Sequence, residues 1–142
     1  LQVTDLDRVV EIDQRIVGRS RRGFFEKRLA AAVEVPDDFV VVGVEEEGEL
    51  VGFAFARIST GDFGLSEAHA VLDAIGVDPD RQTRGIGHVI MLGLDDRLRA
   101  RGVREIRTQT DWRFHDLVRF LDREGFKTAP AHILERQSTN AL

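Results

Sequence analysis

The stretch Asp78-Pro-Asp-Arg-Gln-Thr-Arg-Gly-Ile-Gly87 joins an apolar run to a region with helical spacing. The run before it, residues 70–77, is typical of a buried strand, and apolar residues recur every four positions after it, at Ile86, Ile90 and Leu94. The first N–H groups of a helix have no partner within the helix and lie at the positive end of its dipole. Glycines at such a point let the backbone approach a ligand closely. The stretch therefore predicts either a plain turn or a site for a phosphate group.

Composition places the chain among globular proteins. Its 142 residues suffice for one domain, and 42% hydrophobic with 32% charged residues are typical of a chain that buries a core. We expect a single domain over residues 1–142, with a few residues missing before Leu1 because the chain does not begin with Met. No segment reaches the roughly 18 unbroken apolar residues of a membrane span, and the start shows no secretory pattern. We therefore expect a cytoplasmic protein that does not enter a membrane.

The charge balance limits the classes of partner. Lys and Arg number 20 against 25 Asp and Glu, and the net charge of -5 gives no general attraction for nucleic acid. An anion site must therefore be local. The sequence contains no Cys, which excludes disulfides, thiolate metal ligands and cysteine nucleophiles, and we expect no metal.

Hydrophobic periodicity predicts a mixed α/β fold around one sheet. In the second strand of a predicted hairpin, Phe53 and Phe55 alternate with Gly52 and Ala54, so one face of that strand is nearly bare and something can pack closely there. The expected elements, in order, are helices at 6–16 and 20–32, hairpin strands at 39–44 and 50–58 with a turn at Glu47-Gly48, a loop at 61–66, a strand at 70–77, a third helix ending at Gly102, a strand at 105–109, a fourth helix at 114–121 ended by Gly125, and a short last strand at 133–135.

Two well-known glycine-rich loops do not fit residues 82–87. A P-loop ends in Gly-Lys-Ser/Thr, but His88 and Val89 follow Gly87, so the phosphate-binding lysine and the magnesium-binding hydroxyl are missing. A dinucleotide-binding fingerprint needs a third glycine three residues after Gly87, where Ile90 stands. We therefore expect neither an NTPase nor a Rossmann dinucleotide site.

The order of motifs resembles the GNAT superfamily of acyl-CoA N-acyltransferases. Ile75-Gly-Val-Asp-Pro79 matches the family's apolar-Val-x-Pro phrase at a strand end, and Gln82-Thr-Arg-Gly-Ile-Gly87 matches its Gln/Arg-x-x-Gly-x-Gly/Ala loop. Gly125-Phe126 stands where the family closes a helix with the same pair. The resemblance covers residues 70–126 and implies a single-domain α/β fold whose mixed, mostly antiparallel sheet is flanked by helices.

The resemblance also implies acetyl-CoA as co-substrate, without a metal, and a primary amine that attacks it directly in a ternary complex. Pantetheine is expected in a gap between two splayed strands, beside Ile75, Gly76 and Val77, where a backbone N–H polarises the thioester carbonyl. Arg81 is expected to add positive charge at the rim of the loop. The pyrophosphate is expected on the loop itself, at Gln82, Thr83, Arg84, Gly85, Ile86 and Gly87.

An ammonium must lose a proton before it can attack, so the implied mechanism needs a base or a desolvating pocket. Asp73 is the candidate base, because strand alternation gives it the same parity as Ile75 and Val77. The alternative for Asp73 is a hydrogen-bonded structural carboxylate, or one turned away by a bulge. Glu67 and His69 are rival bases just upstream, with His69 expected as an exposed imidazole near a loop.

The family's usual general acid is missing from this sequence. Many members carry Tyr four residues before the Gly-Phe pair, but Leu121 stands there and the chain contains no Tyr. The family's common Asn, expected seven residues earlier, is Phe114. Water can protonate a departing CoA thiolate at modest cost, because a thiol pKa lies only about one or two units above neutral. Solvent or His115 would therefore act as the acid.

The resemblance places the acceptor site at the first two helices and the loops above the sheet. There Arg19, Arg21, Arg22 and Arg28 either bind an acidic acceptor, contact the CoA 3′-phosphate or form a solvated helix face. Trp112 either packs at a rim or forms one wall of the acceptor pocket.

Two other functions stay open. The missing Tyr allows an acyl-CoA-binding sensor or interaction domain with little or no catalysis. A nucleic-acid-binding module using the arginine-rich face is opposed by the net charge of -5 and by the lack of aromatic residues interleaved with basic ones. Many family members dimerise, so a homodimer is open as well, although no stretch of the sequence specifies an interface.

Overall fold

The computed structural model describes residues 1–59 and 67–138, so the loop expected at 61–66 lies outside the described residues. The chain forms two compact units, Leu1–Thr110 and Asp111–Leu142, and each is described by itself. The single domain over residues 1–142 stays a prediction.

The first unit holds one four-stranded sheet in the order β1-β2-β3-β4. The pairs β1–β2 and β2–β3 are antiparallel and β3–β4 is parallel, so the predicted mixed, mostly antiparallel sheet is confirmed. None of the helices in residues 1–59 and 67–138 is long and apolar enough to cross a membrane. The elements of this unit are η1 (Val3–Asp5), α1 (Leu6–Val17), α2 (Arg22–Glu34), η2 (Pro36–Asp38), β1 (Phe39–Glu46), β2 (Glu49–Ser59), β3 (His69–Val77), η4 (Pro79–Arg84), α3 (Ile86–Ala100) and β4 (Ile106–Arg107).

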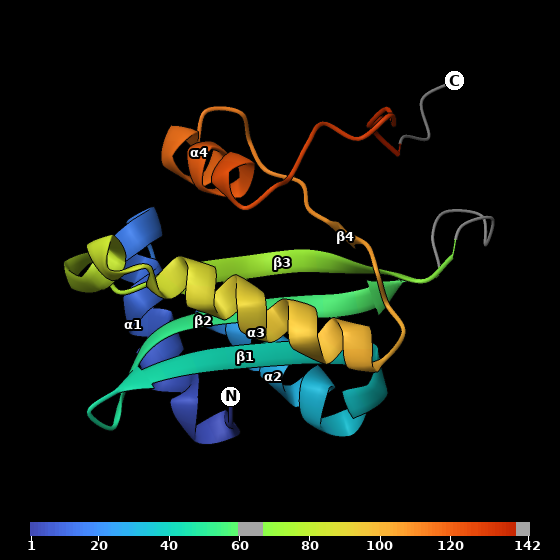
Figure 1. Ribbon diagram of the computed structural model, residues 1–142. Coiled ribbons are helices and arrows are strands. Elements are labelled where there is room, and N and C mark those ends of the chain that lie inside the picture. Colours follow the sequence, from blue (N-terminus) through green and yellow to red (C-terminus); the bar gives the residue numbers. More distant parts are fainter. Residues whose placement is uncertain (60–66, 139–142) are drawn as a thin grey trace. The chain divides into compact units, whose positions relative to one another are not determined.

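Helices cover both faces of the sheet. Figure 1 shows α3 on one face and α1 and α2 on the other. On the side of α1 and α2, the buried rings of Phe25, Phe53 and Phe55 contact one another, with centroids 5.4 to 5.8 Å apart. Against the other face, α3 buries residues that recur at the predicted spacing of four: Ile86, Ile90, Leu94 and Leu98.

The bare face of β2 is filled by α3, as close packing against glycine predicts. A Cβ built on Gly52 would lie 2.7 Å from Ile90 Cδ1 and 3.1 Å from Ile86 Cγ2. A side chain at this position would force Ile90 and Ile86 to shift, so glycine lets the first turns of α3 pack closely against the sheet. Gly52 therefore helps to set where the helix after the glycine loop begins.

The hairpin turn predicted at Glu47-Gly48 is confirmed. Glu47 has φ +53° and Gly48 has φ +81°, so both central residues occupy the left-handed region. Two positive φ values match the twist of a two-residue hairpin, but a non-glycine residue pays a steric penalty there.

The second unit, residues 111–142, contains one helix, α4 (His115–Arg123), among its described residues. Gly125, with φ +90°, follows the helix, and Phe126 N donates to Leu121 O over 3.0 Å while Gly125 N donates to Asp122 O over 3.1 Å. This pair of bonds is a Schellman closure, which explains why a glycine stands in the Gly-Phe pair.

The prediction of a short strand at 133–135 is wrong. Those residues belong to no strand, and the side chains of Ile133 and Leu134 are exposed. Two adjacent apolar side chains do not specify a strand without a neighbour to supply backbone hydrogen bonds.

Candidate functional site

β3 and β4 splay apart after two residue pairs. β4 pairs in parallel with Ala70 and Val71, and the Thr108 hydroxyl then donates to Leu72 O over 2.9 Å. From Asp73 onward, no strand of the described residues pairs with β3 on this side. The predicted strand at 105–109 is correspondingly shorter than expected, because only two of its residues follow β3 closely enough to pair.

The backbone N–H and C=O groups of Ile75 and Val77 point away from β2, toward the gap between β3 and β4. Asp78 N donates to Val51 O of β2 over 2.8 Å. Since successive residues of a strand present their N–H and C=O groups to opposite edges, Val77 and Ile75 present theirs away from β2. The Gln82 side chain agrees with this direction, because its Nε2 donates to Val77 O over 3.2 Å. Gln82 thus ties the glycine loop to the end of the strand.

The glycine loop leads into α3 through Gly85, a residue in the left-handed backbone conformation. Gly85 has φ +72° and is the N-cap of the helix, where a glycine avoids backbone strain. Val89 N donates to Gly85 O over 3.2 Å, so the N–H groups of Ile86 and Gly87 come too early in the helix to find an acceptor within it. The buried Ile86 side chain holds this turn in the core while Gly85 is exposed. Two predicted phosphate-binding side chains lie outside the described residues: Thr83 and Arg84.

A buried carboxylate at the end of β3 fastens the loop to α1. Asp78 is 5% exposed, and its oxygens accept hydrogen bonds from Arg8 Nη2 over 2.7 Å, Arg15 Nη1 over 3.0 Å and Asp80 N over 2.9 Å. The N–H of Asp80 lowers the pKa of Asp78 most, burial opposes it, and the Arg8 and Arg15 charges lower the pKa further. Sequence reasoning missed Asp78 as a functional residue. Its place directly before Pro79, at the start of a helical turn, is a capping signal that predicts such a role.

Asp73 does not share the face of Ile75, so the parity predicted for it is wrong. Phe55 pairs with Ala74 but Ala56 pairs with Leu72, and this bulge leaves Asp73 without a partner on β2. An extra residue in one strand reverses the alternation beyond it. Asp73 therefore lies on the face covered by α1 and α2.

The side chain of Asp73 stands between two guanidinium groups. Its Oδ1 lies 3.4 Å from Arg57 Nε, and its Oδ2 lies 3.5 Å from Arg28 Nη2 of α2. Of the rival bases, Glu67 is exposed, whereas His69 is buried at 5% exposure. The expectation of an exposed His69 is wrong, since the residue opens β3 and pairs with Ser59. Its Nδ1 makes no hydrogen bond with the described residues.

Two of the arginines considered for the acceptor are engaged within the protein. Arg21 Nε donates to the buried Asp13 over 2.8 Å, and its Nη2 donates to the other oxygen of the same carboxylate. Arg22 Nη2 donates to Asp7 over 2.8 Å. These two ion pairs join α1 to α2. A third arginine of the predicted set, Arg28, lies beside Asp73.

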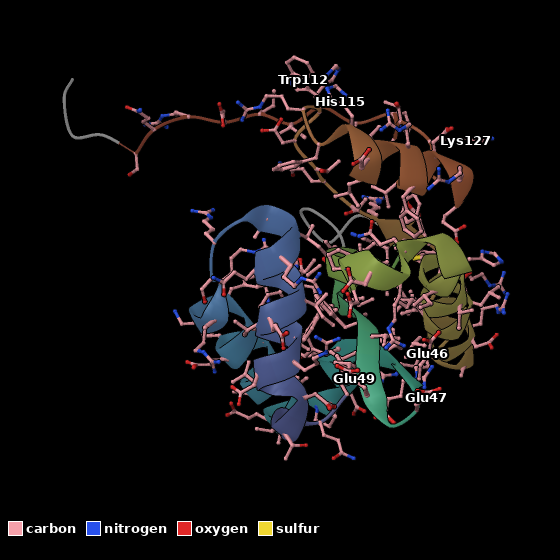
Figure 2. All side chains as sticks on the ribbon, turned by 90° about the vertical axis from the view of Figure 1, so that its left-hand side faces the viewer. Glu46, Glu47, Glu49, Trp112, His115 and Lys127 are labelled. Atoms are coloured by element: carbon pink, nitrogen blue, oxygen red, sulfur yellow. The ribbon has the colours of Figure 1, made fainter. Side chains whose placement is uncertain are left out.

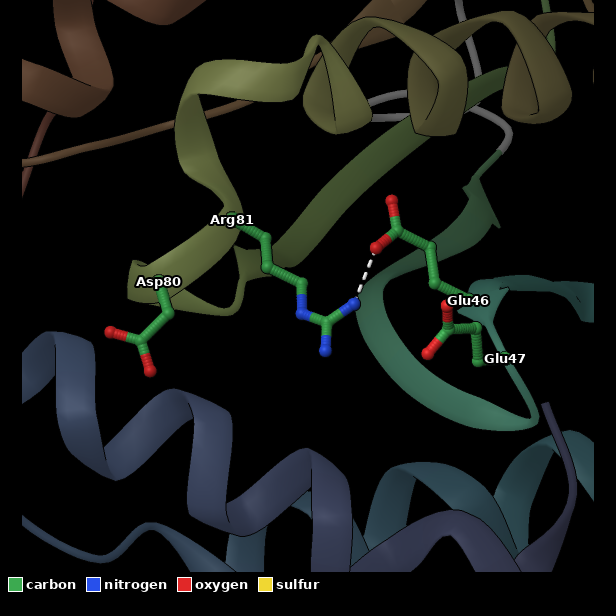
Figure 3. Close-up of a pocket in the computed structure, with 4 residues that line it drawn as sticks. All are labelled: Glu46, Glu47, Asp80 and Arg81. Carbon is green, nitrogen blue, oxygen red and sulfur yellow. Dashed lines mark hydrogen bonds and ion pairs between the residues drawn. The ribbon is translucent and has the colours of Figure 1, made fainter.

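Arg81 points away from the start of α3, contrary to the expected role at the rim of the loop. It donates a hydrogen bond to Glu46 of the β1–β2 hairpin, drawn as a dashed line in Figure 3. Both residues line a pocket of about 630 Å³ together with Glu47 and Asp80. Three carboxylates against one guanidinium make this pocket electrostatically unsuited to a pyrophosphate. We therefore place the candidate site at the β3 edge and the start of α3.

The remaining sequence candidates belong to the second unit. Figure 2 shows Trp112 and His115 near the start of α4. The hydrogen bond from the Arg113 side chain, followed by one from its backbone N–H, lowers the pKa of Asp111 to about 2. The Asp111–Arg113 ion pair stabilises the turn that leads into α4.

Solved structures with the same fold include two aminoglycoside acetyltransferases. The aminoglycoside N-acetyltransferase AAC(6')-Iy in complex with CoA matches with a TM-score of 0.80 and 17% identity over 98% of this chain and 92% of that one. The 6'-N-acetyltransferase AAC(6')-IG from Acinetobacter haemolyticus matches with a TM-score of 0.81 and 10% identity over 99% of this chain and 97% of that one.

Sequence similarity points to the same family. The mycothiol acetyltransferase of Clavibacter michiganensis subsp. michiganensis (strain NCPPB 382) is 32% identical over 89 residues, which make up 63% of this chain and 26% of that protein. The aligned part therefore spans about a quarter of the length of the curated relatives that the chain matches. Residues 6–126 match the acetyltransferase (GNAT) family, and the chain belongs to that family.

Proposed function

We propose that the chain transfers an acetyl group from acetyl-CoA to a primary amine by direct attack in a ternary complex. The observation that supports this most is that two sets of backbone N–H donors follow each other along the chain. The N–H groups of Ile75 and Val77 point away from β2, and one loop later the first N–H groups of α3 follow. Membership of the GNAT family and the match to a CoA-bound acetyltransferase support the same assignment.

The pyrophosphate of CoA would bind the loop from Gln82 to Gly87. Backbone N–H groups of Gly85, Ile86 and Gly87 are suited to it, because a helix start combines unused donors with a positive dipole end. Thr83 and Arg84 complete the proposed set, and Gln82 would act indirectly, by holding the loop against Val77 O. Pantetheine would then run along Ile75, Gly76 and Val77.

The amine nitrogen would attack the thioester carbonyl carbon while the Ile75 N–H polarises the carbonyl oxygen. A C–N bond forms, the C–S bond breaks, and the sulfur leaves with the bonding electron pair. An incoming ammonium must lose one proton before attack and another afterwards. We assign the acceptance of the first proton to Asp73, directly or through water. The departing thiolate gains one proton, and in a chain without Tyr water can supply it.

The absence of Tyr from the sequence favours a second candidate, a domain that binds acyl-CoA without turnover. Its proton-handling machinery would have been lost while the loop and the β3 edge were retained. The two functions predict the same affinity for acetyl-CoA but different product formation.

Calorimetry with acetyl-CoA, followed by a thiol-release assay with a panel of primary amines, tests the proposal. Binding together with amine-dependent CoA release is the expected result. Binding without release under any amine would favour the sensor. Failure to bind acetyl-CoA at all would remove both functions.

A further inference from the structure

On the face of the sheet covered by α1 and α2, one carboxylate lies between two guanidinium groups. The Asp73 side chain is 13% exposed, whereas those of Arg28 and Arg57 are 31% and 41% exposed. We propose that this cluster, Arg28, Arg57 and Asp73, binds an acceptor that carries a carboxylate next to its amine. The proposal rests on the acetyl transfer proposed above and names the substrate class for it.

The two arginines have hydrogen-bonding capacity to spare. Their contacts with Asp73, at 3.4 and 3.5 Å, are ion pairs that are too long for strong hydrogen bonds, and neither side chain donates a hydrogen bond to another described residue. Arg21 differs, because its Nε and its Nη2 both donate to Asp13. Each guanidinium presents five N–H donors in a planar fork that matches a carboxylate.

Contacts with α2 and with the sheet restrain the two arginines of the cluster. The guanidinium carbon of Arg28 lies 5.1 Å from the centre of the Phe24 ring, a cation–π contact that restrains the side chain. Arg57 extends from β2, where its backbone pairs with Val71 of β3. A ligand that bridges Arg28 and Arg57 would therefore join α2 to the sheet.

The charge balance selects the acceptor. One carboxylate and two guanidiniums leave a net charge of about +1, so a ligand with one ammonium and one carboxylate is complementary to the cluster. The ammonium would face Asp73 and the carboxylate would face the arginines. A polycationic amine would bring further positive charge against Arg28 and Arg57, which Coulomb repulsion disfavours.

The cluster also lies near the bond to be made. Asp73 is the bulge residue of β3, two residues before Ile75, whose N–H is the proposed contact of the thioester oxygen. An amine at Asp73 and an acetyl group at Ile75 are therefore close along the strand. The overall reaction is balanced: an ammonium and acetyl-CoA give the amide, the CoA thiol and one released proton.

The test uses the full chain, acetyl-CoA and matched amines: glycine with glycinamide, L-phenylalanine with L-phenylalaninamide and phenethylamine, and neamine as a polycation. We expect kcat/KM for each amino acid to exceed that of its uncharged counterpart by about tenfold or more, because a charge-assisted hydrogen bond is lost in the counterpart. Arg28→Gln and Arg57→Gln should each raise the KM for the amino acid by about tenfold and leave the KM for acetyl-CoA unchanged. Arg99→Gln, whose partner is the exposed Asp96, is the control and should change neither KM.

The ratio of kcat/KM between acid and amide is the decisive readout, because a loss of folded protein lowers both terms equally. Collapse of this ratio in the Arg28 and Arg57 variants alone supports the proposal. Equal or better transfer to amides or neamine overturns the substrate class and leaves the acetyltransferase intact. Bound acetyl-CoA without transfer to any of these amines also overturns it, and no acetyl-CoA binding removes the proposed function itself.

Discussion

Arg8 Nη2 lies 2.7 Å from Asp78 Oδ2, although the two residues are 70 positions apart in the chain. Arg8 also donates from Nε to Leu50 O over 2.8 Å, so one side chain of α1 fixes the start of β2 and the end of β3 together. Asp78 in turn caps the turn that leads into the glycine loop. The position of the proposed CoA loop therefore depends on an ion pair with the first helix.

Asp78→Ala should destabilise the fold by about 3 kcal/mol, because it leaves Arg8 without its most buried partner. Urea unfolding followed by circular dichroism measures the change in the free energy of unfolding. Asp96→Ala is the control, since the Asp96–Arg99 pair is exposed and should contribute less than about 0.5 kcal/mol. Equal effects of the two substitutions would show that the Asp78 pairs do not stabilise the protein.

The same carboxylate should make stability depend on pH. The folded-state pKa of Asp78 lies below its ordinary 3.8, so its contribution is present above that value and is lost as the pH falls through the lower folded pKa. Asp78→Asn removes the titrating group. The difference in free energy of unfolding between the wild type and Asp78→Asn should therefore be constant from pH 7 to about pH 5 and shrink at lower pH. A difference that stays constant down to pH 2 would contradict the assignment.

Local patterns predicted much of the fold because their causes are local. The Glu47-Gly48 turn and the helix end at Gly125 follow from backbone freedom at single residues, and the close packing at Gly52 follows from the lack of a Cβ atom there. The strand expected at 133–135 is wrong because a strand depends on a neighbour, which two apolar side chains cannot specify.

The site was less predictable because its geometry depends on register and on distant partners. Alternation assigned Asp73 to the face of Ile75, but a bulge at Asp73 reverses the alternation, and nothing in the residue types around it signals an extra residue. Arg81 was assigned to the phosphate loop because it is adjacent in sequence. Its partner Glu46 is 35 positions away and becomes a neighbour only in the folded sheet.

Replacing Glu47 should stabilise the protein. Glu47 has φ +53°, and L-residues other than asparagine and aspartate are strained in this region. Glu47→Asn should raise the free energy of unfolding by about 1 kcal/mol and the melting temperature by about 4 °C. Glu45→Asn removes the same charge from the neighbouring strand, where Asn is disfavoured, and should give no increase. A melting temperature that rises equally in both variants would assign the effect to charge and not to the turn.

A side chain at Gly87 should block acetyl-CoA without unfolding the protein. Gly87 lies in the first turn of α3, where the proposed pyrophosphate contacts are backbone N–H groups. Gly87→Leu should weaken acetyl-CoA binding to below detection by calorimetry while the circular dichroism spectrum stays unchanged. Gly23→Leu is the matched control on α2, because a Cβ at Gly23 meets nothing within 4 Å. Undiminished binding by Gly87→Leu would remove the loop from the site.

Asp73→Asn separates proton transfer from the binding of acetyl-CoA. Asn is nearly isosteric with Asp but cannot accept the proton of the incoming ammonium, so kcat should fall by about a hundredfold or more. The rise of kcat/KM with pH should move upward, because the substrate must then be deprotonated by solvent before it binds productively. The affinity for acetyl-CoA should not change, since Asp73 lies beside Arg28 of α2 and not among the proposed pyrophosphate contacts. Asp38→Asn, at an exposed carboxylate in η2, should leave rates and affinities as they are. Identical transfer rates for wild type and Asp73→Asn across the pH range would reject Asp73 as the base and leave His69 or solvent to take the proton.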